Sequence, residues 1–139
     1  MSQTRATSQT ALPRLHFRVP PEPAHLLRAR ERLRDYLRLY CAEAAVINDV
    51  VLCVEEAATN AIKHGGARNI FMSLESENSR LILKIKDDGS GFAPVEAGRT
   101  GMGLRVMHYR ARMIGATLSV RQRKQGGVIV TCSAPWRRN

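Results

Sequence analysis

Two segments with helical periodicity lie in the first half of this 139-residue chain, and they limit the fold more than any other feature. Apolar residues recur every three or four positions from Ala24 to Tyr40 and again from about Ala45 to Lys63. The first of these helices is rich in Arg on its other face. It can therefore pack through one apolar stripe only.

Strand-like segments account for most of the remaining chain, at residues 15–19, 70–74, 81–86, 117–122 and 128–133. The first is expected as a short edge strand before the turn PPEP, and the other four as two hairpins. The polar ESENSR separates the first hairpin pair, and the second turns near Gly126–Gly127. A third helix is expected within GLRVMHYRARMIG, with Gly115 as its C-terminal cap.

The order of these elements is strand, helix, helix, two strands, helix, two strands. It predicts a two-layer α/β sandwich, with about three helices on one face of a mostly antiparallel sheet. The length suits one domain, expected over residues 15–139 after a disordered tail of residues 1–14.

The composition, with 44% apolar and 24% charged residues, indicates an ordinary soluble globular protein. No apolar run approaches the roughly 18 residues of a membrane span, and the polar N-terminus lacks the apolar centre of a secretory signal. A cytoplasmic protein with no membrane partner is expected. Cys41, Cys53 and Cys132 lack metal-ligand spacing and are expected as reduced thiols.

The formal net charge of +10 is unevenly distributed, since no Asp or Glu follows Glu96. This asymmetry suits an acidic partner. Direct nucleic-acid binding is not expected, because no helix-turn-helix, zinc-finger or aromatic RNA-binding signature accompanies the charge.

The segment EEAATNAIKH (55–64) gathers polar groups on the second helix. At 100° per residue, the residues on one face, opposite the apolar stripe, are Asp49, Leu52, Glu56, Asn60 and Lys63. Glu56 and Asn60 are one turn apart, and their oxygens could serve a hard cation such as Mg²⁺. Lys63 could neutralise phosphate oxygens, with His64 nearby. The alternative is a solvated face that makes ordinary intrahelical pairs.

Two glycine-bearing segments follow. DDGSGF (87–92) comes directly after a strand, and its glycines allow a tight turn and close approach to a ligand. An Asp at a strand end can accept a hydrogen bond from a base amino group. GMGL (101–104) opens the third helix, where backbone N–H groups favour phosphate. Either glycine pair alone is weak evidence, because turn chemistry explains such a pair more often than ligand binding does.

Taken together in this order, Glu-x-x-x-Asn on a helix, DxGxG after a strand and GxG at a helix start resemble the GHKL (Bergerat-fold) ATPase superfamily. The resemblance implies a histidine-kinase-like ATP-binding domain that uses ATP and Mg²⁺. Glu56 would be the base or water-positioning carboxylate, Asn60 the Mg²⁺ ligand, and Asp87 the reader of the adenine amino group. The other ATP-binding residues would be Lys63, His64, Gly89, Gly91, Phe92, Gly101, Met102, Gly103 and Leu104.

One position departs from the family pattern. Members usually place a Thr directly after the glycine of the penultimate turn, where this chain has Val128. Thr131 should point to the opposite face of the sheet. The loss of that hydroxyl is expected to cost on the order of 1 kcal/mol of nucleotide affinity. The segment APVEAGRT, between Phe92 and Gly101, would be a short ATP lid.

The residues leave three functional branches open. LHFRVPPEPAHLLRARERLRDYLR followed by VINDVVLCVEEAATNAIKHG looks like the stand-alone anti-sigma factor serine/threonine kinases, which phosphorylate an antagonist protein and sequester a sigma factor. GMGLRVMHYRARMIGATLSV looks more like the catalytic domain of sensor histidine kinases. A nucleotide-gated protein-binding module without transfer is the third branch. Homodimerisation through the first helix is compatible with each.

Overall fold

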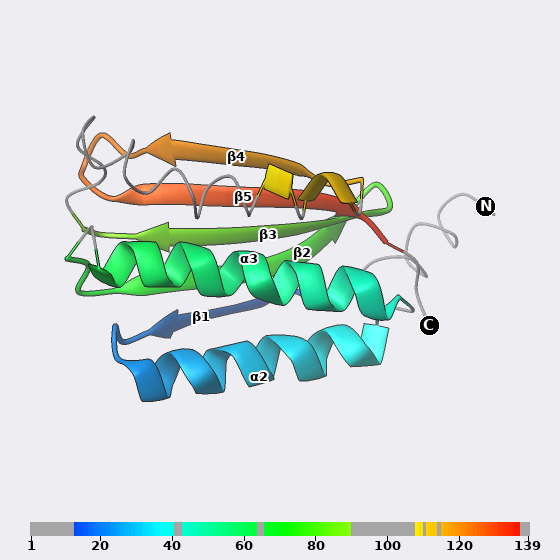
Figure 1. Cartoon of the computed structure of the whole chain (residues 1–139), viewed down its shortest axis with the longest axis horizontal. Coiled ribbons are helices and arrows are strands. Elements are labelled where there is room, and N and C mark those ends of the chain that lie inside the picture. The colour runs from blue at the N-terminus through cyan, green and yellow to red at the C-terminus, as the bar shows by residue number, and fades with distance from the viewer. Residues whose placement is uncertain are drawn as a thin grey trace.

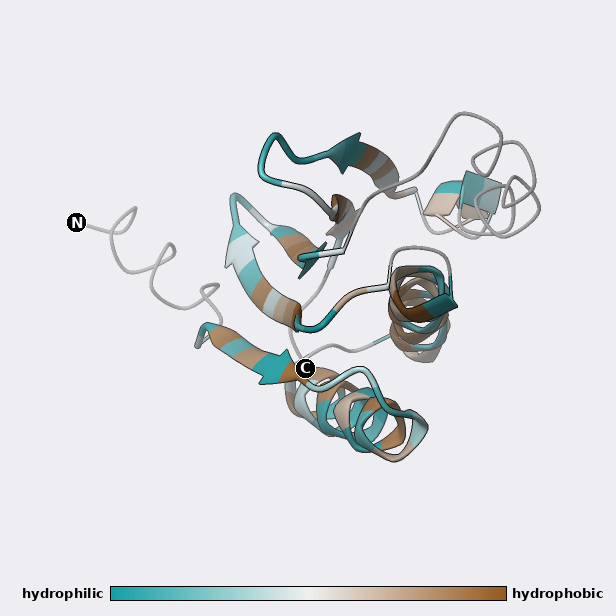
Figure 2. Cartoon of the chain, turned by 90° about the vertical axis from the view of Figure 1, so that its left-hand side faces the viewer, coloured by the Kyte–Doolittle hydropathy of each residue, from teal (hydrophilic) through white to brown (hydrophobic). Residues whose placement is uncertain are grey.

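The computed structural model describes residues 13–40, 43–63, 66–89, 108–109, 111–113 and 115–136. Five strands form one sheet in the order β1-β2-β3-β5-β4, and every neighbouring pair is antiparallel. Helices α2 and α3 cover one face of this sheet (Figures 1 and 2). The two-layer sandwich is therefore confirmed. The described elements are β1 (Leu15–Val19), α2 (Pro23–Tyr40), α3 (Ala44–Lys63), β2 (Ile70–Glu77), β3 (Arg80–Asp87), β4 (Thr117–Gln122) and β5 (Val128–Pro135).

The first hairpin is longer than its apolar residues indicate. Strand β2 runs on to Glu77 and β3 begins at Arg80, so most of the polar ESENSR belongs to strands. Asn78 and Ser79 both have positive φ, 52° and 64°, as a two-residue type I′ turn requires. The segment was mistaken for a loop because it is polar throughout and lacks the alternation of apolar and polar residues that indicates a strand.

The third helix falls largely outside the described residues, although 108–109 and 111–113 are helical. Its predicted cap is confirmed. Gly115 has φ +70°, its amide donates to the carbonyl of Arg112, and the amide of Ala116 donates to that of Ala111 over 2.7 Å. These two bonds make a Schellman motif, which needs a left-handed residue at the position of Gly115.

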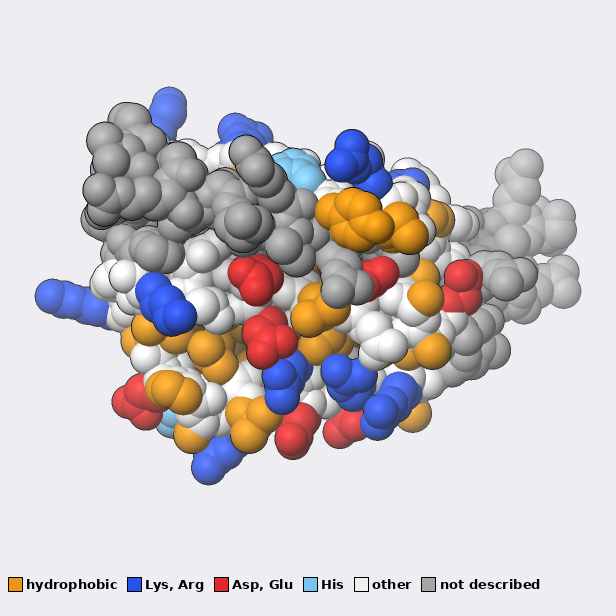
Figure 3. Space-filling model, viewed as in Figure 1, with side chains coloured by type: hydrophobic (Ala, Val, Ile, Leu, Met, Phe, Trp, Pro, Cys, Tyr) orange, Lys and Arg blue, Asp and Glu red, His pale blue; other side chains and the backbone are white. Residues whose placement is uncertain are grey.

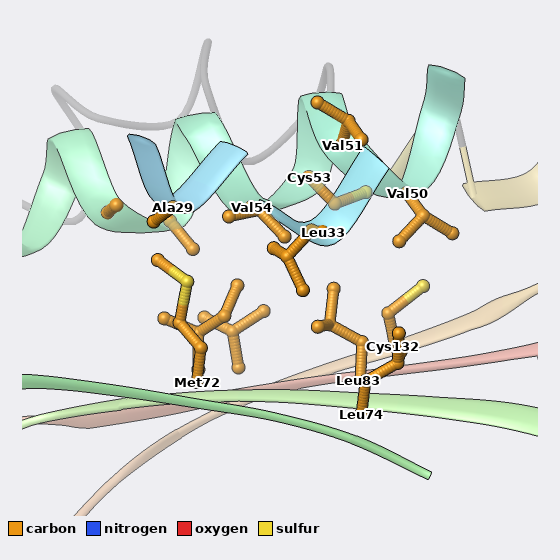
Figure 4. Close-up of a cluster of buried hydrophobic side chains, with 14 of the residues drawn as sticks. Ala29, Leu33, Val50, Val51, Cys53, Val54, Met72, Leu74, Leu83 and Cys132 are labelled. Carbon is orange, nitrogen blue, oxygen red and sulfur yellow. The ribbon is translucent and has the colours of Figure 1, made fainter. Parts of the chain in front are cut away.

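The core lies between the helices and the covered face of the sheet (Figure 4). Leu33 from α2 and Val50 from α3 pack over Leu74 and Leu83, and each is at most 1% exposed. Cys53 and Cys132 form no disulfide and are buried in the same cluster, as expected for reduced structural thiols, whereas Cys41 lies outside the described residues. The core residues are Val19, Ala29, Leu33, Leu37, Val46, Ile47, Val50, Val51, Cys53, Val54, Ala57, Ala58, Ala61, Ala67, Ile70, Met72, Leu74, Leu81, Leu83, Ile85, Ala111, Ala116, Val128, Val130, Cys132, Ala134 and Trp136.

Residues 15–19 form the short edge strand that the sequence predicts. Strand β1 lies at one edge of the sheet and pairs only with β2 among the described strands. Just before it, the Tyr36 hydroxyl donates to the carbonyl of Pro13. The rest of the predicted tail, residues 1–12, lies outside the described residues. Among the described helices, none has the length and apolar character needed to span a membrane.

Candidate nucleotide site

One end of the sandwich collects the polar groups that the sequence indicates. Strand β3 ends there at Asp87, strand β5 begins there at Val128, and α3 reaches it with its C-terminal end (Figure 1). Helix α3 also packs against both β3 and β5. The fold therefore brings Glu56, Asn60 and Asp87 toward the same end of the molecule.

Asp87 is buried, with 5% of its surface exposed. The amide of Gly89 donates to its Oδ1 over 2.9 Å, and the amide of Val128 donates to the same carboxylate. Its own carbonyl accepts a hydrogen bond of 2.8 Å from the Arg123 guanidinium. The carboxylate is thus fixed by backbone groups from two separate segments.

The turn between β4 and β5 forms a wall against this carboxylate. Gly127 has φ +91°, and a Cβ built on it would lie 2.0 Å from the carbonyl oxygen of Asp87 and 2.9 Å from its Oδ1. A Cβ on Gly126 would lie 3.1 Å from the carbonyl oxygen of Gly89. Only glycine permits so close an approach. The two glycines, expected from the sequence as a turn, also shape the site.

The next residue, Asp88, anchors the segment before β2. Its Oδ1 accepts hydrogen bonds of 2.8 Å from the amides of Arg68 and Asn69, and its Oδ2 accepts another from the Asn69 side chain. These bonds lower the pKa of Asp88, with the Asn69 side chain as the largest cause. Asp88 stays ionised and has a structural role.

Asp87 shows the opposite shift. Burial raises its pKa above the usual range, and this effect outweighs the hydrogen bonds from Gly89 and Val128, which lower it. The adjacent carboxylates are therefore held differently, one at the protein interior and one at the surface. A buried Asp with a raised pKa is a candidate for ligand recognition.

Helix α3 separates its two adjacent glutamates. Glu55 faces α2, where its Oε1 lies 2.9 Å from the Arg30 guanidinium. Glu56 is half-buried, and among the described residues it makes no hydrogen bond or ion pair. Of the two adjacent glutamates, Glu56 is therefore the one that the contact between α2 and α3 does not use.

The burial of Asn60 and Asp49 contradicts the alternative of a solvated polar face on α3. Asn60 is 8% exposed and Asp49 is 9% exposed, so both are buried rather than solvated. The periodicity separates polar from apolar positions but does not show which polar positions the fold covers. Among the described residues, the Nδ2 of Asn60 is buried without a hydrogen-bond partner, an arrangement that costs free energy unless a ligand or water completes it.

The remaining predicted site residues divide into two groups. Lys63 is exposed at the last turn of α3, and Gly89 is buried beside Asp87. The others lie outside the described residues, and their placement stays a prediction: His64, Gly91, Phe92, Gly101, Met102, Gly103 and Leu104.

The position of Val128 is as expected from the sequence. Its side chain is buried on the covered face of the sheet, whereas Thr131 is only half-buried and lines the opposite face. Thr131 cannot replace the missing hydroxyl. The backbone of Val128 contributes instead, because its amide donates a hydrogen bond to the Asp87 carboxylate.

Arg123 and the wall made by Gly127 were missed from the sequence. Both act on Asp87 from about forty positions along the chain, and no local pattern indicates such a contact. The only available signal was Gly-Gly between two strand-like segments.

These groups fit a nucleotide with a divalent cation. A buried carboxylate at a strand end suits an amino group, and the unsatisfied carboxamide of Asn60 beside the free Glu56 suits a polar ligand. Among the described residues, no three His, Cys, Asp or Glu side chains gather as a metal site. Mg²⁺ is usually held by one or two protein oxygens together with substrate phosphates and water, and the side-chain oxygen of Asn60 could supply one of them.

Comparison with known proteins gives a consistent result. Residues 19–132 match the protein family described as histidine kinase-like ATPase domain. The sensor protein NarQ homolog of Haemophilus influenzae is 31% identical over 135 residues, which cover 86% of this chain and 24% of that protein. Sensor protein VraS of Staphylococcus aureus is 31% identical over 81 residues, covering 58% of this chain and 23% of its own length. The chain thus spans about a quarter of these curated relatives.

Solved structures show the same fold. The ATP binding domain of PrrB from Mycobacterium tuberculosis superposes with a TM-score of 0.60 and 26% identity, covering 87% of this chain and 97% of that one. The RsbU and RsbW domains of another protein of that organism superpose with a TM-score of 0.70 and 20% identity, covering 92% and 34%.

Proposed function

Because the chain belongs to the family of histidine kinase-like ATPase domains, we propose that it binds Mg²⁺-ATP and transfers phosphate to a protein. The observation that carries this proposal is the setting of Asp87, a buried carboxylate held by two backbone amides against a glycine wall. Such a group can read an amino group on a flat ring, because its orientation is fixed before the ligand arrives.

The residues of α3 supply the other roles. Asn60 would hold the cation, whose positive charge neutralises phosphate oxygens when it is bound. Glu56 would orient the acceptor hydroxyl and accept its proton, since its carboxylate is free among the described residues. Lys63, exposed at the end of the helix, would attract the phosphates. Phosphoryl transfer needs this positioning more than it needs covalent chemistry.

The acceptor we propose is a Ser or Thr of an antagonist protein, with another surface holding a sigma factor or similar regulator. This rests on the resemblance of the first strand and Arg-rich helix to anti-sigma factor kinases. Both segments are part of the folded domain. Strand β1 pairs with β2, and α2 packs on α3, to which it is also joined by the Arg30–Glu55 ion pair.

A second candidate is a catalytic domain that phosphorylates His. The sequence relatives favour it, because those compared above are sensor proteins. On this reading the chain would act on a His-bearing helical hairpin, either supplied separately or part of a longer protein.

Calorimetric titration of Mg²⁺-ATP into the wild type and Asp87→Asn tests the nucleotide site. We expect binding by the wild type and its loss in the variant, because Asn presents an N–H₂ group where the amino group must donate. Glu56→Ala is the matched control, as it should retain binding and lose transfer. Equal affinity of wild type and Asp87→Asn would contradict the proposed site.

Transfer is tested with radiolabelled ATP, a His-bearing hairpin and an extract of the source cells. A labelled protein whose phosphate survives acid supports Ser or Thr, because phosphohistidine is hydrolysed by acid. Acid-labile label on the hairpin supports the second candidate. If ATP binds but neither the hairpin nor a protein of the extract is labelled in a way that depends on Glu56, the remaining candidate is a nucleotide-gated protein-binding module.

A further inference from the structure

The face of the sheet that α2 and α3 leave uncovered, here named the open face, carries a strong positive charge. Figure 2 shows both described helices on the other side. A concavity of about 1130 Å³ lies over the open face, and neither Asp nor Glu is among the described residues that line it. The cations that line it include Arg18, Lys84, Lys86, Arg121, Arg123 and Lys124.

The strand register places these cations in an ordered row. Arg18 pairs with Phe71, Phe71 with Lys86, Lys86 with Ile129, and Ile129 with Arg121. Cationic and apolar side chains therefore alternate across all five strands. At about 4.8 Å per strand, the row spans about 19 Å, and its cations recur about every 10 Å.

Most of these charges lack an acidic neighbour. Among the described residues, neither Lys84, Arg121 nor Lys124 has an ion pair, and Lys86 lies over the Phe71 ring at 5.7 Å. Glu75 on the same face is already 3.9 Å from Arg14. On the helical side, by contrast, Figure 3 shows Asp and Glu interspersed with Lys and Arg. On the described strands, Glu75 and Glu77 share the register of the open face, but they lie toward the β2–β3 turn and neither lines the concavity.

We propose that the open face is a docking surface for an acidic segment of a partner protein that carries apolar side chains among its carboxylates. The charge requires an anionic partner. The alternation with Phe71 and Ile129 favours a protein, because a phosphate backbone offers charge without apolar groups. Sheets that read single-stranded nucleic acid stack bases on several aromatic rings, whereas here the exposed ring is Phe71, partly covered by Lys86.

The test uses a fluorescent peptide of alternating Glu and Leu, without nucleotide, so its outcome is independent of the proposed kinase activity. Binding is followed by anisotropy for the wild type and for Lys84→Glu with Arg121→Glu. Both side chains face away from Asp87. We expect the reversed pair to weaken binding at least about tenfold, because like charges would replace attraction.

Arg28→Glu with Arg38→Glu is the matched control, since both residues are exposed on α2 and the charge change is equal. It should change affinity less than about twofold. An equal loss in this control, or no binding of the peptide by the wild type at low salt, would overturn the proposal. Tighter binding of oligothymidylate or phosphatidylserine vesicles than of the peptide would overturn it in favour of nucleic acid or membrane.

Circular dichroism and thermal unfolding confirm that each variant is folded. If the reversed pair does not fold, Lys84→Gln with Arg121→Gln removes the same charges without reversing them. That pair is expected to weaken peptide binding at least about threefold.

Discussion

At the scale of single residues, the tightest constraint in the described part of the chain is the contact between Gly127 and Asp87. The glycine must have positive φ, and it must also lack a Cβ, because the Asp87 carbonyl oxygen occupies that space. Gly66 meets only the first requirement, with φ +59° and no atom within 4 Å of a built Cβ. The two positions therefore separate backbone strain from steric overlap.

We predict that Gly127→Ala lowers the free energy of unfolding by about 2 to 5 kcal/mol, as strain and overlap add. Gly66→Ala should cost only about 1 kcal/mol, the strain alone. Urea unfolding of both variants measures the difference. Equal losses in the free energy of unfolding would show that the backbone around Gly127 shifts to accommodate a Cβ without further destabilisation.

Burial of Asp87 also predicts a pH dependence. Its folded pKa is raised above the unfolded value near 3.8, so the native state holds its proton more tightly. The contribution to stability is present below pH 3.8 and is lost as pH rises through the folded pKa. Asp88 has a lowered pKa and acts in the opposite direction: its contribution to stability is present above pH 3.8 and is lost as pH falls through the folded pKa.

Asp87→Asn should therefore reduce the loss of stability as pH rises above 3.8, since Asn has no charge to bury. Chemical unfolding at pH 4 and pH 7 measures this, with Asp88→Asn as the control. The control should instead lose stability at pH 7, because it removes a carboxylate that accepts three hydrogen bonds. An unchanged pH profile in Asp87→Asn would mean that its carboxyl is not effectively buried.

At the scale of elements, hydrophobic period was enough to predict both long helices and the hairpins. The periods of 3.6 residues in a helix and 2 residues in a strand follow from local backbone geometry, so they can be recognised in a sequence whose fold is unknown. The burial of Asn60 and the approach of Gly127 to Asp87 depend on contacts between distant segments. Sequence reasoning therefore named Asp87 and Gly89 as site residues, but not the contacts that Arg123 and Gly127 make with Asp87 from the distant β4–β5 turn.

The contact between α2 and α3 allows a test at this scale. The Arg30–Glu55 ion pair joins them at 2.9 Å, with side chains 35% and 44% exposed. A double-mutant cycle to Ala should give a coupling energy of about 0.5 to 1 kcal/mol, since the pair is only partly screened. The control is Arg38–Asp35 within α2, at 3.9 Å with exposures of 63% and 77%, which should couple by less than about 0.3 kcal/mol. Equal couplings would show that the pair between helices adds nothing to their packing.

At the scale of the whole molecule, the two faces of the sheet serve different purposes. The covered face packs the core and supports the candidate nucleotide site, while the open face concentrates positive charge. A chain with a net charge of +10 repels itself, and its cations on the open face lie close together. Folding brings these charges together on a face that is not part of the core, so the salt concentration should affect the stability of the protein through this face.

The last prediction follows from the spacing of that row. Two unit charges about 10 Å apart in water repel by about 0.4 kcal/mol, so the two adjacent pairs among Arg18, Lys86 and Arg121 cost on the order of 1 kcal/mol at low salt. The screening length falls from about 30 Å at 0.01 M salt to about 3 Å at 1 M, which removes this cost. Unfolding of the wild type should therefore become less favourable by that amount as sodium chloride is added. Arg121→Glu should show a clearly smaller salt effect than Arg28→Glu, because only the first change breaks the row. Equal salt effects in the two variants would mean that the repulsion comes from the total charge and that the open face has no special share in it.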